Sequence, residues 1–142
     1  MRLNEAQGGR RKTKAQRTRE EGGPSLSTAP TVAVVGAGRL GTALALALAS
    51  CGYVVVAVVA RRAARARRAA SLISARTLAL PASQLSKLPP ARLLLVTTPD
   101  DHIPAAAARL ASHVTAEPSS VALHGSGALS SDVLAPLRAR GF

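Results

Sequence analysis

The stretch VAVVGAGRLGTAL, residues 32–44, decides the fold of this chain. A short apolar run leads into the pattern Gly-x-Gly-x-x-Gly, and an Ala- and Leu-rich segment follows it directly. This order predicts a buried strand, a glycine turn and a helix, which is the context that a dinucleotide-binding fingerprint requires. The residues predicted to contact a cofactor here are Gly36, Ala37, Gly38, Arg39, Leu40 and Gly41.

Each glycine of the turn has a different expected task. Gly36 permits the tight turn out of the strand, Gly38 lets the backbone approach a pyrophosphate, and Gly41 lets the helix pack close to the sheet. The helix N-terminus supplies free N–H groups and a positive dipole end for the phosphates. Arg39 opposes that dipole, so a bound anion would explain a cation at this position; the alternative is an arginine that simply faces solvent.

Apolar runs and helical segments alternate along the rest of the chain. Strands are expected at residues 31–35, 53–60, 77–80, 92–97 and 121–124, and helices at residues 39–50, 61–71, 83–88, from 100 or 101 to 112, and from 130 onward. Such alternation at short spacing predicts an α/β fold with a Rossmann-type, doubly wound parallel sheet, right-handed crossovers and helices on both faces. A ligand of such a sheet lies across the carboxyl ends of the strands.

The end of the second predicted strand distinguishes the two nicotinamide cofactors. An NAD site places Asp or Glu about 20 residues beyond the glycines, on the ribose 2′-hydroxyl. Here that position is Ala60, followed by Arg61 and Arg62, and no acidic residue lies between Gly36 and Leu95. A guanidinium pair suits a 2′-phosphate, so the sequence favours NADP(H) over NAD(H). Three further arginines are interpreted as an exposed helix face: Arg65, Arg67 and Arg68.

The fourth predicted strand ends in Thr97, Thr98 and Pro99. Hydroxyls and free backbone groups at this edge of the sheet are suited to contact a cofactor ribose. The second interpretation is a strand stop followed by Asp100 or Asp101 as the cap of the next helix, and both interpretations can hold together.

The fifth predicted strand ends in His124, and Ser126 follows within a glycine-rich loop. A histidine at the ligand edge is a candidate acid or base at neutral pH. A single histidine is more often structural, so His124 and Ser126 are weak candidates and the catalytic residues stay unassigned. The three histidines show no metal-ligand spacing, and no metal is expected.

Composition excludes several classes of protein. No apolar run reaches the roughly 18–20 residues of a membrane span, and polar residues rather than an apolar core follow Met1, so we expect a cytoplasmic protein with no membrane contact. The single cysteine, Cys51, excludes an internal disulfide and is expected to be a small buried residue at a helix-to-strand turn.

The net charge of +12 is shared by both parts of the chain. Residues 1–30 hold seven Lys/Arg and three Glu, and residues 31–142 hold twelve Lys/Arg and four Asp/Glu. The first segment has too few apolar residues to offset its ordering entropy, which predicts a disordered basic extension over 1–30 and one domain over 31–142. The basic charge is the only feature that supports nucleic-acid binding. The basic segment has no aromatic residue on which a base could stack, which argues against that function.

Three segments together resemble a known family: VVGAGRLG at residues 34–41, TTPDD at 97–101 and HGSGAL at 124–129. They resemble the N-terminal Rossmann-like domain of a family of oxidoreductases that pair it with a helical C-terminal domain of unknown function. They are similar in turn to pyrroline-5-carboxylate reductase, the F420-dependent NADP reductases and the 6-phosphogluconate dehydrogenase superfamily. The resemblance covers residues 31–142 and implies a nicotinamide-dependent reductase or dehydrogenase, with NADP the favoured cofactor.

The chain departs from this family pattern at both ends. In the larger relatives the helical domain completes the substrate pocket and usually the dimer, whereas this chain stops at Phe142, before a sixth strand. It is therefore expected to be a fragment or an incomplete gene product, with any homodimer formed through the missing domain. The leading hypothesis is the NADP(H)-binding domain of an oxidoreductase that transfers hydride to or from an unidentified small substrate. The alternatives are a non-catalytic nucleotide-binding or sensor module, and an inactive truncated fragment.

Overall fold

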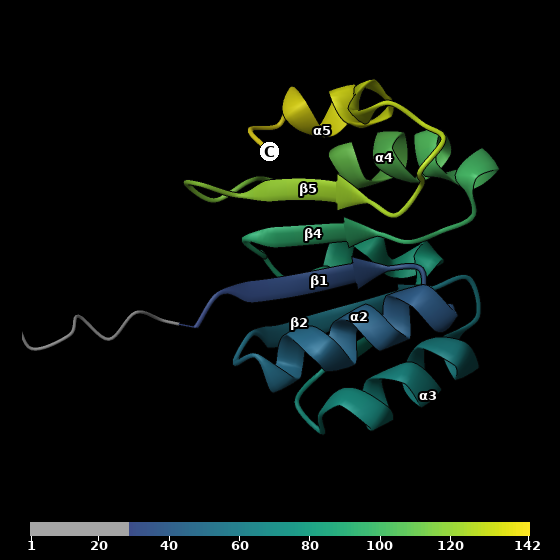
Figure 1. Ribbon diagram of the computed structural model, residues 1–142, viewed down its shortest axis with the longest axis vertical. Coiled ribbons are helices and arrows are strands. Elements are labelled where there is room, and N and C mark those ends of the chain that lie inside the picture. The colour runs from purple at the N-terminus through teal and green to yellow at the C-terminus, as the bar shows by residue number, and fades with distance from the viewer. Residues whose placement is uncertain (1–28) are drawn as a thin grey trace, which may run out of the picture.

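The computed structural model describes residues 29–142, which form a five-stranded parallel sheet in the order β3-β2-β1-β4-β5. The strands are β1 (Thr31–Val35), β2 (Val54–Ala60), β3 (Leu78–Pro81), β4 (Leu93–Val96) and β5 (Val121–His124). Helices cover both faces of the sheet, and the visible strand arrows all point the same way (Figure 1). The predicted α/β class, with a Rossmann-type doubly wound parallel sheet, is confirmed.

The helices are α2 (Arg39–Ser50), α3 (Ala63–Ile73), α4 (Ile103–Ala111) and α5 (Ala135–Arg138). Three short 3-10 turns complete the connections: η1 (Ala82–Lys87) lies between β3 and β4, η2 (Asp100–His102) leads into α4, and η3 (Ser131–Leu134) leads into α5. The segment predicted as a helix from residue 61 begins only at Ala63. Arg61 and Arg62 therefore lie in the connection between β2 and α3.

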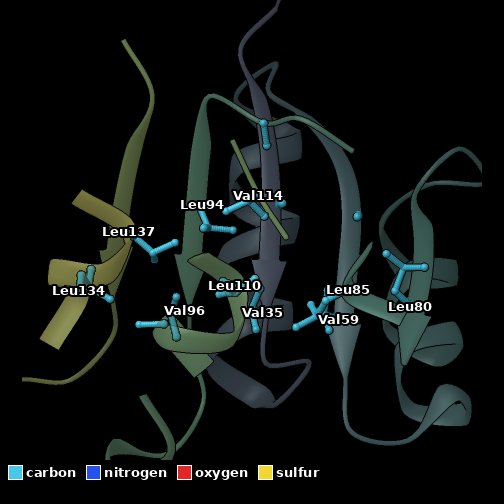
Figure 2. Close-up of a cluster of buried hydrophobic side chains, with 14 of the residues drawn as sticks. Val35, Val59, Leu80, Leu85, Leu94, Val96, Leu110, Val114, Leu134 and Leu137 are labelled. Atoms are coloured by element: carbon cyan, nitrogen blue, oxygen red, sulfur yellow. The ribbon is translucent and has the colours of Figure 1, made fainter. Parts of the chain in front are cut away.

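Alternate residues of β1 point to opposite faces of the sheet. Ala33 and Val35 belong to a core beneath α4 and the C-terminal turns, whereas Val32 and Val34 belong to a second core beneath α2 and α3. Figure 2 shows the first core, where leucines such as Leu110 meet the valines of the strands. The second core is built largely from valine and alanine, whose small size lets α2 and α3 lie close to the sheet.

Two local expectations are wrong. Cys51 is exposed rather than buried; it is the C-cap of α2, and its backbone N–H donates to the Ala47 carbonyl. Neither Asp100 nor Asp101 caps the helix after β4, since Pro99 precedes η2 and no side chain caps η2 or α4. The carboxylate of Asp100 forms a different hydrogen bond, described below.

Within residues 29–142, no helix combines the length and the apolar character needed to cross a bilayer. The same residues contain no group of three or more His, Cys, Asp or Glu side chains arranged to hold a metal ion. The extension predicted over residues 1–30 lies outside the described residues apart from its last two. That extension and the compartment of the protein stay predictions.

Candidate functional site

The carboxyl ends of β1, β2 and β4 lie side by side. Val35 pairs with Val59 on one side and with Val96 on the other. The pairing continues beyond the strands: the Gly36 N–H donates to the Val59 carbonyl at 2.9 Å, and the Thr97 N–H donates to the Val35 carbonyl at 2.8 Å. The strand order reverses between β1 and β4, so these residues lie at the switch point where ligands of such sheets bind.

The glycine turn is held against β4 by close contacts. Gly36 has a φ of +117°, and a Cβ on it would lie 2.6 Å from the Thr97 carbonyl carbon and 2.7 Å from the Thr98 nitrogen. A Cβ on Gly41 would overlap the Gly36 carbonyl oxygen and the Thr97 Oγ1. The Thr97 hydroxyl donates to the Gly36 carbonyl at 2.8 Å. Thr97 thus braces the turn, and its predicted contact with a cofactor ribose stays a prediction.

Gly38 differs from the other two glycines because a Cβ there would meet nothing within 4 Å. It is the N-cap of α2, where no side chain supplies a capping hydrogen bond and no acidic residue lies in the first turn. The first N–H groups of α2 therefore lack a side-chain partner, and the positive end of the helix dipole faces open space. Arg39 and Leu40 beside it are exposed. This geometry suits an approaching anion.

The end of β2 meets the same turn through Val59. Its carbonyl accepts hydrogen bonds from both the Gly36 N–H, at 2.9 Å, and the Ala37 N–H, at 3.2 Å. Arg61 and Arg62 follow two and three residues later, and both are exposed. Neither forms a salt bridge within residues 29–142. The ligand edge thus carries two guanidinium groups that no carboxylate of this part of the chain neutralises.

The outer arginines of α3 lie on its solvent side. The helix buries Ala66, Ala69 and Ala70 against the sheet. The interpretation of the remaining arginines as an exposed helix face is confirmed for Arg65, Arg67 and Arg68.

Thr98 carries a polar atom that the fold leaves unused. Its Oγ1 is buried and has no hydrogen-bond partner among the described residues. A buried hydroxyl without a partner costs about 1–3 kcal/mol, so its persistence at the ligand edge suits a hydroxyl that bonds a ligand. Pro99, the next residue, is exposed and precedes η2.

The two threonines offer a matched pair of substitutions. We expect Thr97→Val to lower the free energy of unfolding by about 1–2 kcal/mol, because it removes the bond to the Gly36 carbonyl. We expect Thr98→Val to leave stability unchanged or raise it slightly, because the hydroxyl that it removes is unpaired. Urea unfolding of both variants measures the difference. Equal losses in the two variants would contradict this distinction.

The loop after β5 joins the site from the other side. The Gly125 N–H donates to the Val96 carbonyl at 3.0 Å, which extends the β4–β5 pairing past His124. His124 and Ser126 are partly buried, and the Ser126 hydroxyl donates to the Asp100 carboxylate at 2.8 Å. Sequence reasoning did not find Asp100 as part of this group, since nothing in its local pattern points to a partner 26 residues away.

A cavity of about 190 Å³ opens at the opposite, amino-terminal edge of the sheet. It is lined by the segment before β4, by His113, Val114 and Thr115 after α4, and by Phe142. None of the predicted cofactor-binding residues reaches it, so it is separate from the ligand edge at the glycine turn.

These features define an α/β domain whose doubly wound sheet carries a glycine turn at its switch point. The sequence profile of the Rossmann-like domain family matches residues 19–142, and the chain belongs to that family. The resemblance inferred from the sequence to a Rossmann-like domain is thereby confirmed.

Solved oxidoreductases share this fold. A Bacteroides fragilis protein described as an NADP oxidoreductase is 24% identical, with a TM-score of 0.61 over 71% of this chain and 37% of its own. A 3-ketoreductase of Actinomadura kijaniata, in complex with TDP-benzene and NADP, is 18% identical, with a TM-score of 0.59 over 80% of this chain and 37% of its own. Prephenate dehydrogenase from A. aeolicus, in complex with hydroxyphenyl propionate and NAD+, is 18% identical, with a TM-score of 0.62 over 82% of this chain and 41% of its own.

The matched region spans about two-fifths of the length of each of these structures. At such identities the likeness establishes the fold. A search of curated protein sequences gives no significant match.

Proposed function

We propose that residues 31–142 form the NADP(H)-binding domain of an oxidoreductase that transfers hydride to or from a small substrate. The observation that carries this proposal is an open glycine turn at the switch point, with two unneutralised arginines at the end of the adjoining strand. The structural neighbours include proteins described as an NADP oxidoreductase, an NADP complex and an NAD+ complex, which supports a nicotinamide cofactor.

The residues at the ligand edge fit such a cofactor along its length. The first-turn N–H groups of α2, reached past Gly38, would hold the pyrophosphate. Arg61 and Arg62 would hold the 2′-phosphate through charge-assisted hydrogen bonds. The unpaired Thr98 hydroxyl would bond the nicotinamide ribose. When bound, the nicotinamide supplies or accepts the hydride, and the protein contributes position and electrostatics.

The preference for NADP(H) follows from charge at the end of β2. A carboxylate there would accept hydrogen bonds from a ribose 2′-hydroxyl and would repel a 2′-phosphate. This chain has Ala60 at that position and guanidinium groups immediately after it. An arginine fork gains two hydrogen bonds to a phosphate that it cannot make to a hydroxyl.

Calorimetric titration with NADPH and NADH tests this function. We expect NADPH to bind with a dissociation constant in the micromolar range and NADH to bind about 10- to 100-fold more weakly, since a hydrogen bond to a charged group contributes about 1.5–3 kcal/mol. A variant that lacks residues 1–28 serves as a control and should keep both affinities. Failure of both dinucleotides to bind below about 1 mM would reject the cofactor, and equal affinities would reject the role of the arginine pair.

A further inference from the structure

The loop after β5 contains a hydrogen-bonded group that the proposed cofactor contacts do not use. The Ser126 hydroxyl donates to Asp100 Oδ2 at 2.8 Å. It also accepts the N–H groups of Ala128, at 3.1 Å, and Leu129, at 3.2 Å. A serine hydroxyl has one donor and two acceptor positions, so all of them are occupied. Ser126 is therefore fixed in one orientation by partners on both sides.

Ser126 acts in turn on His124. Its backbone N–H donates to His124 Nδ1 at 3.3 Å. A neutral imidazole has one donor and one acceptor nitrogen, so a ring that accepts at Nδ1 carries its proton at Nε2. Within residues 29–142 the structure shows no hydrogen bond at Nε2. The ring thus holds an N–H donor that no residue of this part of the chain uses.

Asp100 connects this loop to the neighbouring strand. It opens η2, four residues after the end of β4, whereas Ser126 lies two residues after the end of β5. The two strands pair as far as Val96 and His124. The bond from Ser126 to Asp100 therefore closes the gap between two loops that leave adjacent strands, and it fixes the backbone whose N–H meets Nδ1.

The position of His124 along the sheet indicates which part of a dinucleotide it faces. In the proposed function the glycine turn at the end of β1 would receive the pyrophosphate, and the arginines at the end of β2 lie on one side of it. With the strand order β3-β2-β1-β4-β5, the adenosine half would then lie on the β2 side and the nicotinamide half on the opposite side, toward the ends of β4 and β5. The nicotinamide ring carries a carboxamide, whose oxygen accepts hydrogen bonds.

We propose that Asp100 is a positioning residue that acts through Ser126, and that His124 is a neutral hydrogen-bond donor to the carboxamide oxygen of the nicotinamide rather than an acid or base. The positioning stands on the hydrogen bonds of this chain, and the ligand contact rests on the proposed function. The Ser126 N–H occupies Nδ1, and the Nε2–H is free to donate. A neutral imidazole is an effective donor to a carbonyl group.

NMR of the ligand-free protein, labelled with 15N and recorded at a pH where imidazole is neutral, tests the positioning. We expect His124 to show the Nε2–H tautomer and a 15N–15N coupling between its Nδ1 and the Ser126 amide. The exposed His113 serves as the internal reference for an unrestrained ring. In Asp100→Ala we expect the coupling to disappear and the His124 signals to move toward those of His113. In Asp100→Asn both should persist, because an amide oxygen still accepts from the Ser126 hydroxyl.

Asp101→Ala is the matched control, because the Asp101 side chain is 77% exposed and lies 3.9 Å from His102, outside this group. Backbone amide spectra show whether each variant is folded. Ser126→Ala provides a second route, since it removes the hydroxyl without touching the carboxylate, and it should also release the ring. A wild-type ring that resembles His113, or an Asp100→Ala ring that resembles the wild type, overturns the positioning role.

Titration of the same sample with NADPH and with 2′,5′-ADP tests the ligand contact. We expect NADPH to shift the Nε2–H resonance and 2′,5′-ADP, which lacks the nicotinamide, to leave it in place. Bound NADPH without such a shift overturns the contact. If NADPH fails to bind while the ring tautomer is fixed, the proposed function fails and the positioning role stands, so the two failures are distinguishable.

Discussion

Gly36→Ala is expected to lose about 2–5 kcal/mol of unfolding free energy, and NADPH binding with it. The new Cβ would lie within 3 Å of the Thr97 and Thr98 backbones, which belong to the end of β4 and cannot rotate away as a flexible side chain can. Overpacking of this kind costs about 1–3 kcal/mol. The φ of +117° adds about 1–2 kcal/mol, because an L side chain is strained there. Urea unfolding and calorimetry measure both losses.

Gly38→Ala is the control for this substitution. Its Cβ would meet nothing within 4 Å, and its φ of −86° suits any residue, so we expect stability to change by less than about 0.5 kcal/mol. The methyl group would nevertheless lie where the backbone must approach the pyrophosphate, so NADPH affinity should fall at least about 10-fold. The comparison separates a glycine that the fold requires from one that the ligand requires. Similar loss of stability in both variants would contradict that separation.

The double substitution of Arg61 and Arg62 by alanine is expected to weaken NADPH binding by about 100-fold and to leave NADH binding within about 2-fold of the wild type. The charge-assisted hydrogen bonds to the 2′-phosphate are lost, which at an exposed site together contribute about 1.5–3 kcal/mol, whereas NADH has no group there to lose. Both side chains are exposed, so the fold should be unaffected. Calorimetry with the two cofactors measures the ratio directly.

The matched control replaces Arg67 and Arg68 by alanine. This substitution removes the same amount of charge from the exposed side of α3. At physiological ionic strength the Debye length is about 8 Å, so these more distant charges should change NADPH affinity by no more than about 3-fold. Equal losses from the two pairs would show a general attraction to a basic surface. A parallel loss of NADH binding in the first pair would show that the arginines contact the adenosine rather than the 2′-phosphate.

The fold follows from local patterns in this sequence. Strands buried on both faces occur in the sequence as uninterrupted apolar runs, as in β1 (Thr31–Val35) and β2 (Val54–Ala60), and the helix between these two strands begins just after Gly38 and ends two residues before Gly52. The turn at Gly36 was predictable for the same reason, since a strand that passes straight into a helix leaves only glycine at the junction. Right-handed crossovers then follow from general rules for such sheets, whereas the strand order β3-β2-β1-β4-β5 comes from the structure.

Other features depend on residues far apart in the chain and left no local pattern to read. The bond between Ser126 and Asp100 spans 26 residues, and a carboxylate before a helix is ordinarily interpreted as a cap. The hydrogen bond from the Thr97 hydroxyl to the Gly36 carbonyl likewise joins residues that are 61 positions apart. Val121 and Leu123 of β5 belong to an apolar run typical of a buried strand, yet they are 47% and 49% exposed, because burial depends on which helix covers the strand.

The bond between Thr97 and Gly36 also bears on when the glycine turn becomes complete during synthesis. The two residues are 61 positions apart. When the ribosome has completed residues 32–44, which contain the glycine motif, it has therefore not yet synthesised Thr97. The entropy cost of closing the loop between Gly36 and Thr97 comes before the contact contributes any stability. Formation of this turn is therefore one of the non-local, slower events of folding. A growing chain that has not reached β4 thus carries the recognisable motif without its site. Binding competence arrives with the second half of the sheet.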